Sequence, residues 1–484
     1  MLLCIFNNAH LLKTYHGHQL EQCTMGCIQF RLQEEFMIDL TAIFKAYDVR
    51  GKVGTELTPD LLTDIGRAFA DWLPTQGTVA VGHDMRPDSE GLAQALIAGL
   101  RQQGRDVLDI GKVTTDMIYF AVGHNNLAGG AVVTASHNPG EYNGIKFCGE
   151  QAKAIGQESG LFEIRDIVMR GEFKTADTPG NVTPQDVTED WITHVLSFID
   201  TDKLTPIKIA VDAGNGMAGA IFPELEPYVP WDVTELYFEL DGTFPNHEAN
   251  PMKYETLQDM ITVIKDNGLY GGVAFDGDGD RALLVDETGE VLSGGVLSAL
   301  LAEHFLKLYP GANIVIDVRN SHSAIDVVKE NGGTIIRSRV GHSFIKQDMR
   351  QHDAPFGGEA SGHFYFRDNW YADSGLIAAV IGLYVATITK RKLSEIRQQY
   401  TRYAAIPETN FTVEDKAGAM QAIAAAFADV TPDYFDGVTL NFSDGAWLNV
   451  RPSNTESILR LNAEANTPER LAELTQKVTK LIQK

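Results

Sequence analysis

An alternation of acidic residues and glycines in the middle of the chain has the composition of a metal-binding loop. The apolar run GGVAF is followed by Asp276, Asp278 and Asp280 in the segment DGDGDR. Carboxylates at i, i+2 and i+4 repel one another when ionised, and glycines let the backbone wrap them around one hard cation. We therefore expect Mg²⁺ here. Calcium is an alternative, because Glu287 stands at the twelfth position of an EF-hand-like spacing, but Arg281 occupies the sixth position, where an EF-hand has glycine. A solvated acidic turn without metal is the other alternative.

A second polar loop carries a serine. The segment TASHNP, residues 134–139, follows another apolar run and places Ser136 next to His137. A serine hydrolase is one interpretation of this pair, but neighbouring side chains are expected to point apart and no Gly-x-Ser-x-Gly elbow is present. Phosphoryl transfer agrees better with one serine and three acids, because a metal and cations then neutralise the phosphate oxygens in transit. We interpret the loop as a phosphate carrier.

Three copies of one strand-and-helix pattern must position these loops. Short β-rich runs at 78–82, 207–211 and 313–316 each precede a predicted helix. A second apolar run in each copy ends in a loop with glycine: VLDIGKVTT, LYFELDGTF and TIIRSRVGH. A third begins with paired glycines at 129–130, 271–272 and 357–358, and the polar loops follow it. Strands that alternate with helices predict parallel pairing, in which the loops at strand carboxyl ends gather at a ligand site.

The pattern changes after Arg402. A helix-like run covers 417–428, strands are expected around VTLNF and AWLNVR, and a last helix begins at Thr467. The predicted fold class is α/β: three repeated α/β domains, each a mixed sheet between helices, and a smaller C-terminal α+β domain, placed around a central cleft. The expected boundaries are 37–192, 193–296, 297–401 and 402–484.

The composition excludes several classes of partner. Of 484 residues, 44% are apolar, and 40 basic residues face 65 acidic ones, for a net charge of −25. This excess of acid argues against nucleic acid, and no run of about 20 apolar residues is present to span a membrane. Four cysteines are too few for a disulfide scaffold and fit a reducing cytoplasm.

Residues 1–36 differ in composition from the rest. A zinc site formed by two histidines and two cysteines is an alternative there, but the ligands His16, His18, Cys23 and Cys27 lack a regular spacing. A secretory signal is disfavoured, because Lys13 follows the short apolar start and no clear cleavage site appears. We expect a non-native or disordered extension, with the true start at Met37: Gln33, Glu34 and Glu35 can be encoded by a purine-rich ribosome-binding sequence.

Four short motifs in sequence order resemble those of the α-D-phosphohexomutase family. They are TASHNP (134–139), DGDGDR (276–281), GEASGH (358–363) and RPSNTE (451–456). FKAYDVRG (44–51) and VGHSFIK (340–346) are similar to the phosphomannomutase/phosphoglucomutase branch. The resemblance runs from about Met37 to the C-terminus. Arg319 stands where some relatives have lysine, which weakens any inference about the preferred sugar.

The resemblance implies an isomerase that interconverts the 6-phosphate and 1-phosphate of mannose, and of glucose as well. Ser136 would be phosphorylated in the resting enzyme, Mg²⁺ would bind that phosphate together with Asp276, Asp278 and Asp280, and a hexose 1,6-bisphosphate would be the intermediate. The alternatives are a phosphoglucosamine mutase and a non-catalytic, metal-stabilised sugar-phosphate binding protein. Both a monomer and a dimer agree with the sequence.

The resemblance also implies roles for individual residues. Proton handling on the reacting hydroxyl is expected from Lys146, His363 and Arg50, with His137 beside Ser136. Glu359 and Ser361 would bind sugar hydroxyls. The distal phosphate would be held by a guanidinium and short donors, which are Arg451, Ser453, Asn454 and Thr455. Further substrate contacts are expected from Tyr47, Arg281, Arg319, His342 and Arg460, and Lys346 is a weaker candidate.

Overall fold

The computed structural model describes residues 38–453 and 458–483, and Leu40–Lys484 form one compact unit. The predictions for residues 1–36, including the zinc alternative, and the predicted start at Met37 lie outside the described residues. The predicted phosphate contacts of Asn454 and Thr455 also lie outside them.

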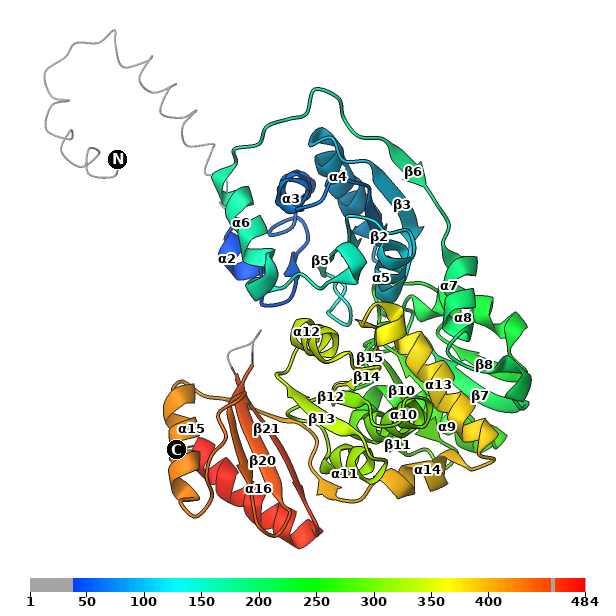
Figure 1. Cartoon of the computed structure of the whole chain (residues 1–484), viewed down its shortest axis with the longest axis vertical. Helices are drawn as coiled ribbons and strands as arrows, with labels where there is room; N and C mark the ends of the chain where they lie inside the picture. Colours follow the sequence, from blue (N-terminus) through cyan, green and yellow to red (C-terminus); the bar gives the residue numbers. More distant parts are fainter. Residues whose placement is uncertain (1–37, 454–457, 484) are drawn as a thin grey trace, which may run out of the picture. The chain divides into compact units, whose positions relative to one another are not determined.

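The first sheet has six strands in the order β1-β5-β4-β2-β3-β6, of which β2, β3, β5 and β6 are labelled in Figure 1. Every residue of β2 (Val79–His83) and β4 (Gly129–Val133) is buried, and strands covered on both faces require such continuous apolar runs. The helix α3 begins where Thr58 accepts a hydrogen bond from the backbone N–H of Leu61, with proline at the first helical position. The remaining elements are α2 (Leu40–Ile43), β1 (Val49–Lys52), α3 (Pro59–Trp72), α4 (Ser89–Gln102), β3 (Val107–Lys112), α5 (Thr115–His124), β5 (Tyr142–Gly149), α6 (Leu161–Arg170) and β6 (Val182–Pro184).

The second and third sheets repeat this design with five strands each. The second has the order β11-β10-β9-β7-β8 and the third β13-β12-β14-β15-β16. The second unit comprises α7 (Thr188–Leu196), β7 (Ile207–Asp212), α8 (Ala218–Leu225), β8 (Trp231–Leu236), α9 (Gln258–Asn267), β9 (Gly271–Phe275), β10 (Ala282–Asp286) and β11 (Val291–Leu292). The third comprises α10 (Gly294–Leu308), β12 (Asn313–Asp317), α11 (His322–Glu330), β13 (Thr334–Ser338), α12 (His342–His352), β14 (Phe356–Gly358), β15 (Phe364–Phe366), β16 (Ala372–Asp373), α13 (Gly375–Ile388) and α14 (Leu393–Tyr400).

The three units share one arrangement of strands, which confirms the predicted repeat of α/β units with mixed sheets. β2, β7 and β12 each pair in parallel with both neighbours. One parallel neighbour of each of these strands, β4, β9 or β14, then turns back into an antiparallel partner, giving the hairpins β4–β5, β9–β10 and β14–β15. The polar segments 134–141, 276–281 and 359–363 are the connections of these hairpins.

Two details of the predicted repeat are wrong. The glycine pair of the third unit ends β14 instead of beginning it. The run LYFELDGTF lies almost entirely beyond β8, to which it contributes only Leu236. β8 is an edge strand in which only the first and last residues are buried, so its sequence WDVTEL is less apolar than the run that follows.

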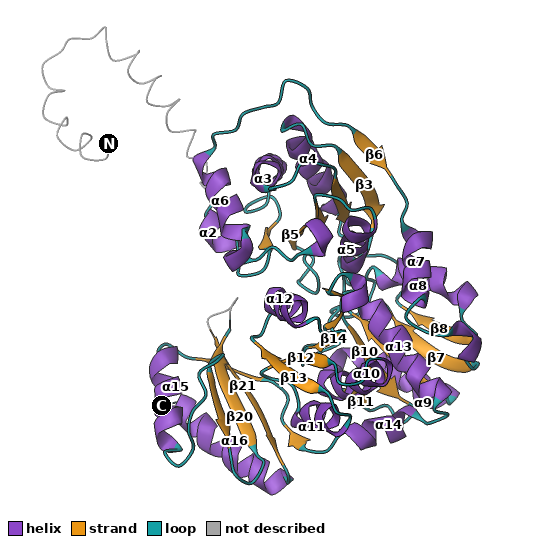
Figure 2. Ribbon diagram, in the orientation of Figure 1, coloured by secondary structure: helices purple, strands orange, loops and turns teal. Residues whose placement is uncertain are grey.

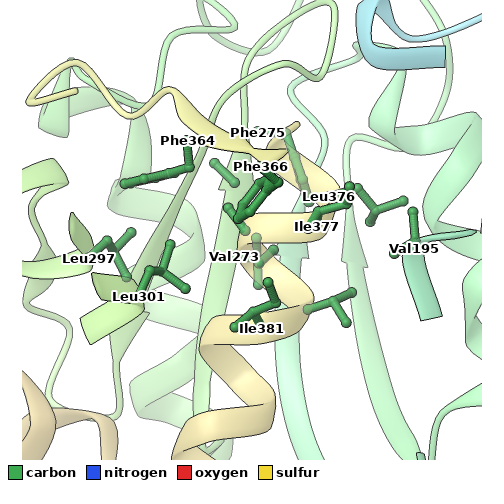
Figure 3. Packing of buried hydrophobic residues seen from close by; sticks show 14 of the residues in the cluster. Val195, Val273, Phe275, Leu297, Leu301, Phe364, Phe366, Leu376, Ile377 and Ile381 are labelled. Carbon is green, nitrogen blue, oxygen red and sulfur yellow. The ribbon is translucent and has the colours of Figure 1, made fainter. Parts of the chain in front are cut away.

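One core of buried apolar side chains runs through all three α/β units. At its centre lies α13, in which residues 375–387 are all buried, and a helix that is packed on all sides needs apolar residues on every face. Figure 3 shows Leu376, Ile377 and Ile381 of α13 among side chains of the second and third units, including Phe275 and Phe366. Within the described ranges, every helix is too short or too polar to span a lipid bilayer.

The fourth unit is antiparallel and has a core of its own. Its sheet has the order β17-β21-β20-β19, with β18 also paired to β21. The helices α15 and α16 pack on each other and on this sheet (Figure 2). The elements are β17 (Ala404–Ala405), β18 (Thr409–Thr412), α15 (Lys416–Ala426), β19 (Val438–Asn441), β20 (Trp447–Pro452), β21 (Ile458–Ala465) and α16 (Pro468–Ile482). The predicted smaller α+β domain is confirmed.

Candidate active site

The hairpin connections of the three α/β units contact one another in succession, beginning at Ser136. Its Oγ donates a hydrogen bond to Asp276 Oδ2 at 2.9 Å, so the first connection touches the second. Gly277 permits this approach, because a Cβ at that position would lie 2.5 Å from the carbonyl oxygen of Ser136. The third connection joins the second through a backbone bridge between Arg281 and His363. Parts of the chain that are far apart in sequence therefore form one site.

The serine loop has an unusual backbone and is held by a buried arginine. Ser136 has a φ of 52°, a left-handed conformation that a non-glycine residue adopts only at a cost of about 1–3 kcal/mol. Its N–H donates to Thr134 Oγ1 at 2.9 Å, and its carbonyl accepts from Arg86 Nη2 at 2.9 Å. Arg86 also pairs with Asp84 at 3.2 Å, and both side chains are buried. The same guanidinium donates at 2.6–2.9 Å to the carbonyls of Asn138, Pro139 and Tyr142.

Arg50 holds the other side of the serine loop. Its Nη1 donates to the carbonyl of Ala135 and, at 2.7 Å, to Asn138 Oδ1. Asp48 orients the guanidinium from 2.8 Å. Arg50, for which proton handling is predicted, thus contacts the serine loop at Ala135 and Asn138, and its hydrogen bonds among the described residues do not include Ser136 Oγ.

The acidic loop is buried and already faces two cations. Asp276, Asp278 and Asp280 are exposed by no more than 2%. Lys146 Nζ lies 2.7 Å from Asp278 Oδ2 and 2.5 Å from Asp280 Oδ2, while Arg281 lies 2.9 Å from Asp276 Oδ2. Three carboxylates thus face two basic side chains. Burial raises the pKa of Asp276 above its ordinary value even though Arg281 opposes that shift.

These residues fit a hard divalent cation. Each of the three carboxylates offers an oxygen, and the three oxygens lie within 4.8 Å of one another. The Oδ1 atoms of Asp278 and Asp280 are buried without a hydrogen-bond partner among the described residues. An all-oxygen donor set with surplus negative charge is what Mg²⁺ prefers. The glycines serve the same purpose, since Gly279 has a φ of 75° in the turn between the ligands.

The calcium alternative does not agree with the structure. The loop 276–281 connects two strands rather than two helices. Glu287, the residue at the twelfth position, accepts hydrogen bonds from the N–H and hydroxyl of Ser394 instead of turning back to the acidic loop. The hydrogen bonds to Ser394 fix this carboxylate at the start of α14.

Ser136 and His137 do not point apart, contrary to our expectation for neighbouring residues. His137 Nδ1 lies 3.1 Å from Ser136 Oγ, because the left-handed backbone of the serine turns both side chains to the same side. The same Nδ1 also contacts Arg281 Nη2. Burial, together with Arg281 and Arg50, lowers the pKa of His137 well below its ordinary value. A neutral imidazole flanked by cations is a poor general base, which argues against the serine hydrolase alternative.

The third connection gathers Glu359, Ser361 and His363. Ser361 Oγ donates to Glu359 Oε2 at 2.7 Å, and His363 Nδ1 lies 3.1 Å from the same oxygen. His363 Nε2 faces the acidic loop at 3.6 Å from Asp280 Oδ1. Burial would lower the pKa of His363, but the hydrogen bond to Glu359 and the charge of Asp280 raise it. The His363 imidazole therefore lies between Glu359, which is predicted to bind sugar hydroxyls, and Asp280, which is predicted to bind the metal.

Tyr47 and His342 meet at the border of the first and third units. Their rings lie 5.5 Å apart, and the Tyr47 hydroxyl donates to the carbonyl of Val340 at 2.8 Å. Burial and the nearby Lys346 lower the pKa of His342 to about 4. Lys346 itself is fully buried, 2.6 Å from Asp373 Oδ1 and over the ring of Tyr119, so its contacts are within the protein interior.

Three arginines predicted to contact the substrate, Arg451 of the phosphate-binding set among them, gather around a carboxylate that the sequence did not single out. Glu408 lies 3.3 Å from Arg319, 2.9 Å from Arg460 and 3.7 Å from Arg451. Arg319 links this group to the sugar loop, because its Nη2 lies 3.4 Å from Ser361 Oγ. Ser453 directly follows β20, and its N–H donates to the carbonyl of Ile458 at 2.9 Å. A line of contacts thus connects Ser136 with the fourth unit.

The sequence analysis missed Arg86 and Glu408 as site residues. A signal for the first was present: the segments DMR (84–86) and DVR (317–319) follow equivalent strands, and in each the aspartate pairs with the arginine two residues later. Glu408 had no such signal, because it stands in an irregular segment before a short edge strand. Thr115 was also missed, although its hydroxyl donates to Asp278 Oδ2 at 2.6 Å.

Comparison with known proteins identifies the family. Residues 41–193, 189–289 and 293–403 match alpha/beta/alpha domains I, II and III of phosphoglucomutase/phosphomannomutase, and residues 408–481 match its C-terminal domain. The chain is 40% identical over 444 residues to "Phosphohexose mutases" of Xanthomonas campestris pv. campestris, covering 91% of this chain and 98% of the relative. It is 39% identical to a phosphomannomutase of Vibrio cholerae over 467 residues, covering 93% and 99%.

A solved structure agrees with this result. The phosphoglucomutase/phosphomannomutase family protein of Burkholderia thailandensis superposes with a TM-score of 0.85 at 31% identity, covering 92% of this chain and 98% of the other. Four matched domains in order, relatives that align over nearly their whole length, and hairpin loops that contact one another in succession from Ser136 lead to the same conclusion. This chain belongs to the phosphoglucomutase/phosphomannomutase family.

Proposed function

We propose that this chain is a phosphohexomutase that interconverts the 6-phosphate and 1-phosphate of mannose and of glucose through a phosphorylated Ser136. The observation that carries the proposal is the position of Ser136 Oγ, 2.9 Å from an acidic loop that fits Mg²⁺ and 3.4 Å from the guanidinium of Arg281. A phosphate on this oxygen would meet a cation on several sides, as phosphoryl transfer requires.

In the first half of the reaction, the bond between phosphorus and Ser136 Oγ breaks and a bond to the free sugar hydroxyl forms. The proton of that hydroxyl needs an acceptor. His363 is suited to this, because Nδ1 faces Glu359 and Nε2 is left toward the acidic loop. Glu359 and Asp280 stabilise the imidazolium that results. The second half returns the other phosphate of the hexose 1,6-bisphosphate to Ser136.

Lys146 acts as a fixed cation rather than as a base. Although burial alone would lower its pKa, Asp278 and Asp280 raise it above the ordinary value, so the ammonium keeps its proton at neutral pH. When Mg²⁺ is bound by Asp276, Asp278 and Asp280, it supplies charge neutralisation for the phosphate oxygens. Arg281 and Arg50 complete the positive surroundings of the serine.

The sugar must present each of its ends to Ser136 in turn. Glu359 and Ser361 offer hydrogen bonds to hydroxyls that look alike in the two orientations, and Arg319 lies next to them. Arg451 and Arg460 on adjacent strands would hold the phosphate that is not reacting. Cytoplasmic location and sugar-phosphate partners follow from this proposal.

Intact-mass measurement of the purified protein tests the phosphoserine. We expect an increment of one phosphate that disappears in Ser136→Ala, together with a loss of turnover of at least about 1,000-fold. Ser197→Ala, at an exposed serine after α7, is the matched control and should keep both. Full turnover by Ser136→Ala would refute the role.

A coupled assay with the 1-phosphates of mannose, glucose and glucosamine, in the presence of catalytic bisphosphate, tests the substrate. Turnover of glucosamine 1-phosphate far above the other two would replace the proposal with a phosphoglucosamine mutase. No turnover of any of them would favour a non-catalytic sugar-phosphate binding protein.

A further inference from the structure

Glu408 is surrounded by three guanidinium groups expected to contact the substrate, those of Arg319, Arg451 and Arg460, which we call the arginine clamp. Its Oε1 lies 2.9 Å from Arg460, and its Oε2 lies 3.3 Å from Arg319 and 3.7 Å from Arg451. Asn462 donates to the same Oε2 at 3.1 Å. One carboxylate thus receives the donors that a phosphate group would use.

These groups come from two units of the fold. Arg319 follows β12 of the third unit, whereas Glu408 directly precedes β18, which pairs with the strand that carries Arg460 and Asn462. Arg319 is already paired with Asp317 at 2.6 Å, so its contact with Glu408 is the longer of its two ion pairs. The glutamate is therefore held more firmly by its own sheet than by the third unit.

Glu408 is ionised in this position. Burial would raise its pKa, but the three arginines lower it to about 2. A carboxylate and a dianionic phosphate repel each other, so they cannot share the same guanidinium groups without cost. One of the two must leave when the other binds.

The exposure of the side chains indicates which group moves. The side chains of Arg319 and Arg451 are only 6% and 3% exposed, whereas that of Glu408 is 26% exposed. Arg319 and Arg451 are thus fixed by packing, whereas Glu408 and its partner Arg460, which is 23% exposed, have a route to solvent. We propose that Glu408 is an internal anion that occupies this arginine clamp in the resting enzyme and is displaced by the phosphate group of the substrate. This inference rests on the proposed function for the identity of the substrate.

Because phosphate must displace the Glu408 carboxylate, the carboxylate weakens phosphate binding. Removing the negative charge of Glu408 should therefore strengthen phosphate binding. Glu408→Gln keeps the shape and an acceptor oxygen but deletes the charge that competes with phosphate. With one fewer anion beside a dianion, at a separation of several ångströms in a partly buried site, we expect phosphate to bind about tenfold more tightly. KM for the sugar phosphate should fall by a similar factor, while kcat stays level or falls because the product leaves more slowly.

Titration calorimetry with inorganic phosphate, using the full chain, is the direct test. Glu464→Gln is the matched control: this carboxylate also joins the fourth unit to the third, at 2.9 Å from the N–H of His322, but no arginine contacts it in the described residues. We expect its affinity for phosphate to stay within twofold of wild type. In an Arg460→Gln background, Glu408→Gln should increase the affinity for phosphate by a smaller factor. Such a dependence would show that Glu408 acts through its contact with this arginine.

Unchanged or weaker phosphate binding by a folded Glu408→Gln would overturn the proposal. If that variant does not fold, Glu408→Asp serves instead, because the shorter side chain withdraws the charge and should tighten binding about two- to threefold. The titration does not depend on turnover. If the protein has no mutase activity, the proposed function is refuted, and the titration still tests whether Glu408 competes with phosphate.

Discussion

Arg86 offers the sharpest test of how the fold positions the serine. Arg86→Lys keeps the charge but replaces a planar group that reaches four loop carbonyls with a single ammonium. At least two of these carbonyls then lose their donor. The contact with Ser136 is buried and the others are partly buried, and the loss of a buried hydrogen bond costs about 1–3 kcal/mol. We expect the free energy of unfolding to fall by about 3 kcal/mol. The Ser136 carbonyl is one of the four, so the serine should also shift, and a displacement of about 1 Å lowers kcat about 100-fold.

Arg105 provides a control with the same chemistry at another place. Its guanidinium donates at 2.6–3.3 Å to the carbonyls of Ala70, Leu73 and Thr75, at the end of α3 and away from the serine loop. Arg105→Lys should cost a similar free energy of unfolding in urea titrations, with kcat within twofold of wild type. The reasoning is refuted if Arg86→Lys is destabilised to the same extent as Arg105→Lys and yet keeps kcat.

Three further perturbations test the site. Asp278→Asn should remove most turnover while the protein stays folded, and added Mg²⁺ should no longer raise Tm as it does in wild type; turnover without Mg²⁺ would contradict the metal assignment. Gly277→Ala should lower kcat at least tenfold, because the new Cβ meets the Ser136 carbonyl, whereas Gly91→Ala on α4, where nothing lies within 4 Å, should stabilise by about 0.5–1 kcal/mol in urea unfolding. The pKa of Glu408 is lowered from 4.5 to about 2, so its stabilising effect is present above pH 4.5 and is lost as pH falls toward 2. The difference in Tm between wild type and Glu408→Gln should shrink over that range, and a constant difference would contradict the ion-pair assignment.

The amino-acid sequence alone predicts most of the central strands and the loops that follow them. Central strands such as β4 and β9 are buried on both faces, and their continuous apolar runs made them easy to recognise. The edge strand β8 was misplaced because half of its residues face solvent. The contact of Ser136 with His137 could not be predicted either, because it depends on a left-handed serine that Arg86 and Thr134 hold in place.

The sequence by itself determined which chemical groups this protein has and in which repeated unit each of them stands. The serine of the first loop and the aspartates and glycines of the second act within a single turn of the chain. A short sequence motif is therefore enough to identify them. Only the tertiary structure decided how the units share the site: that Lys146 of one hairpin pairs with two aspartates of another, and that Glu408 lies among arginines from two units. Such pairings depend on the relative placement of whole sheets, which no local pattern encodes. The shared core around α13 fixes the three α/β sheets relative to one another, and polar contacts such as that of Glu464 with the N–H of His322 join the fourth unit to the third.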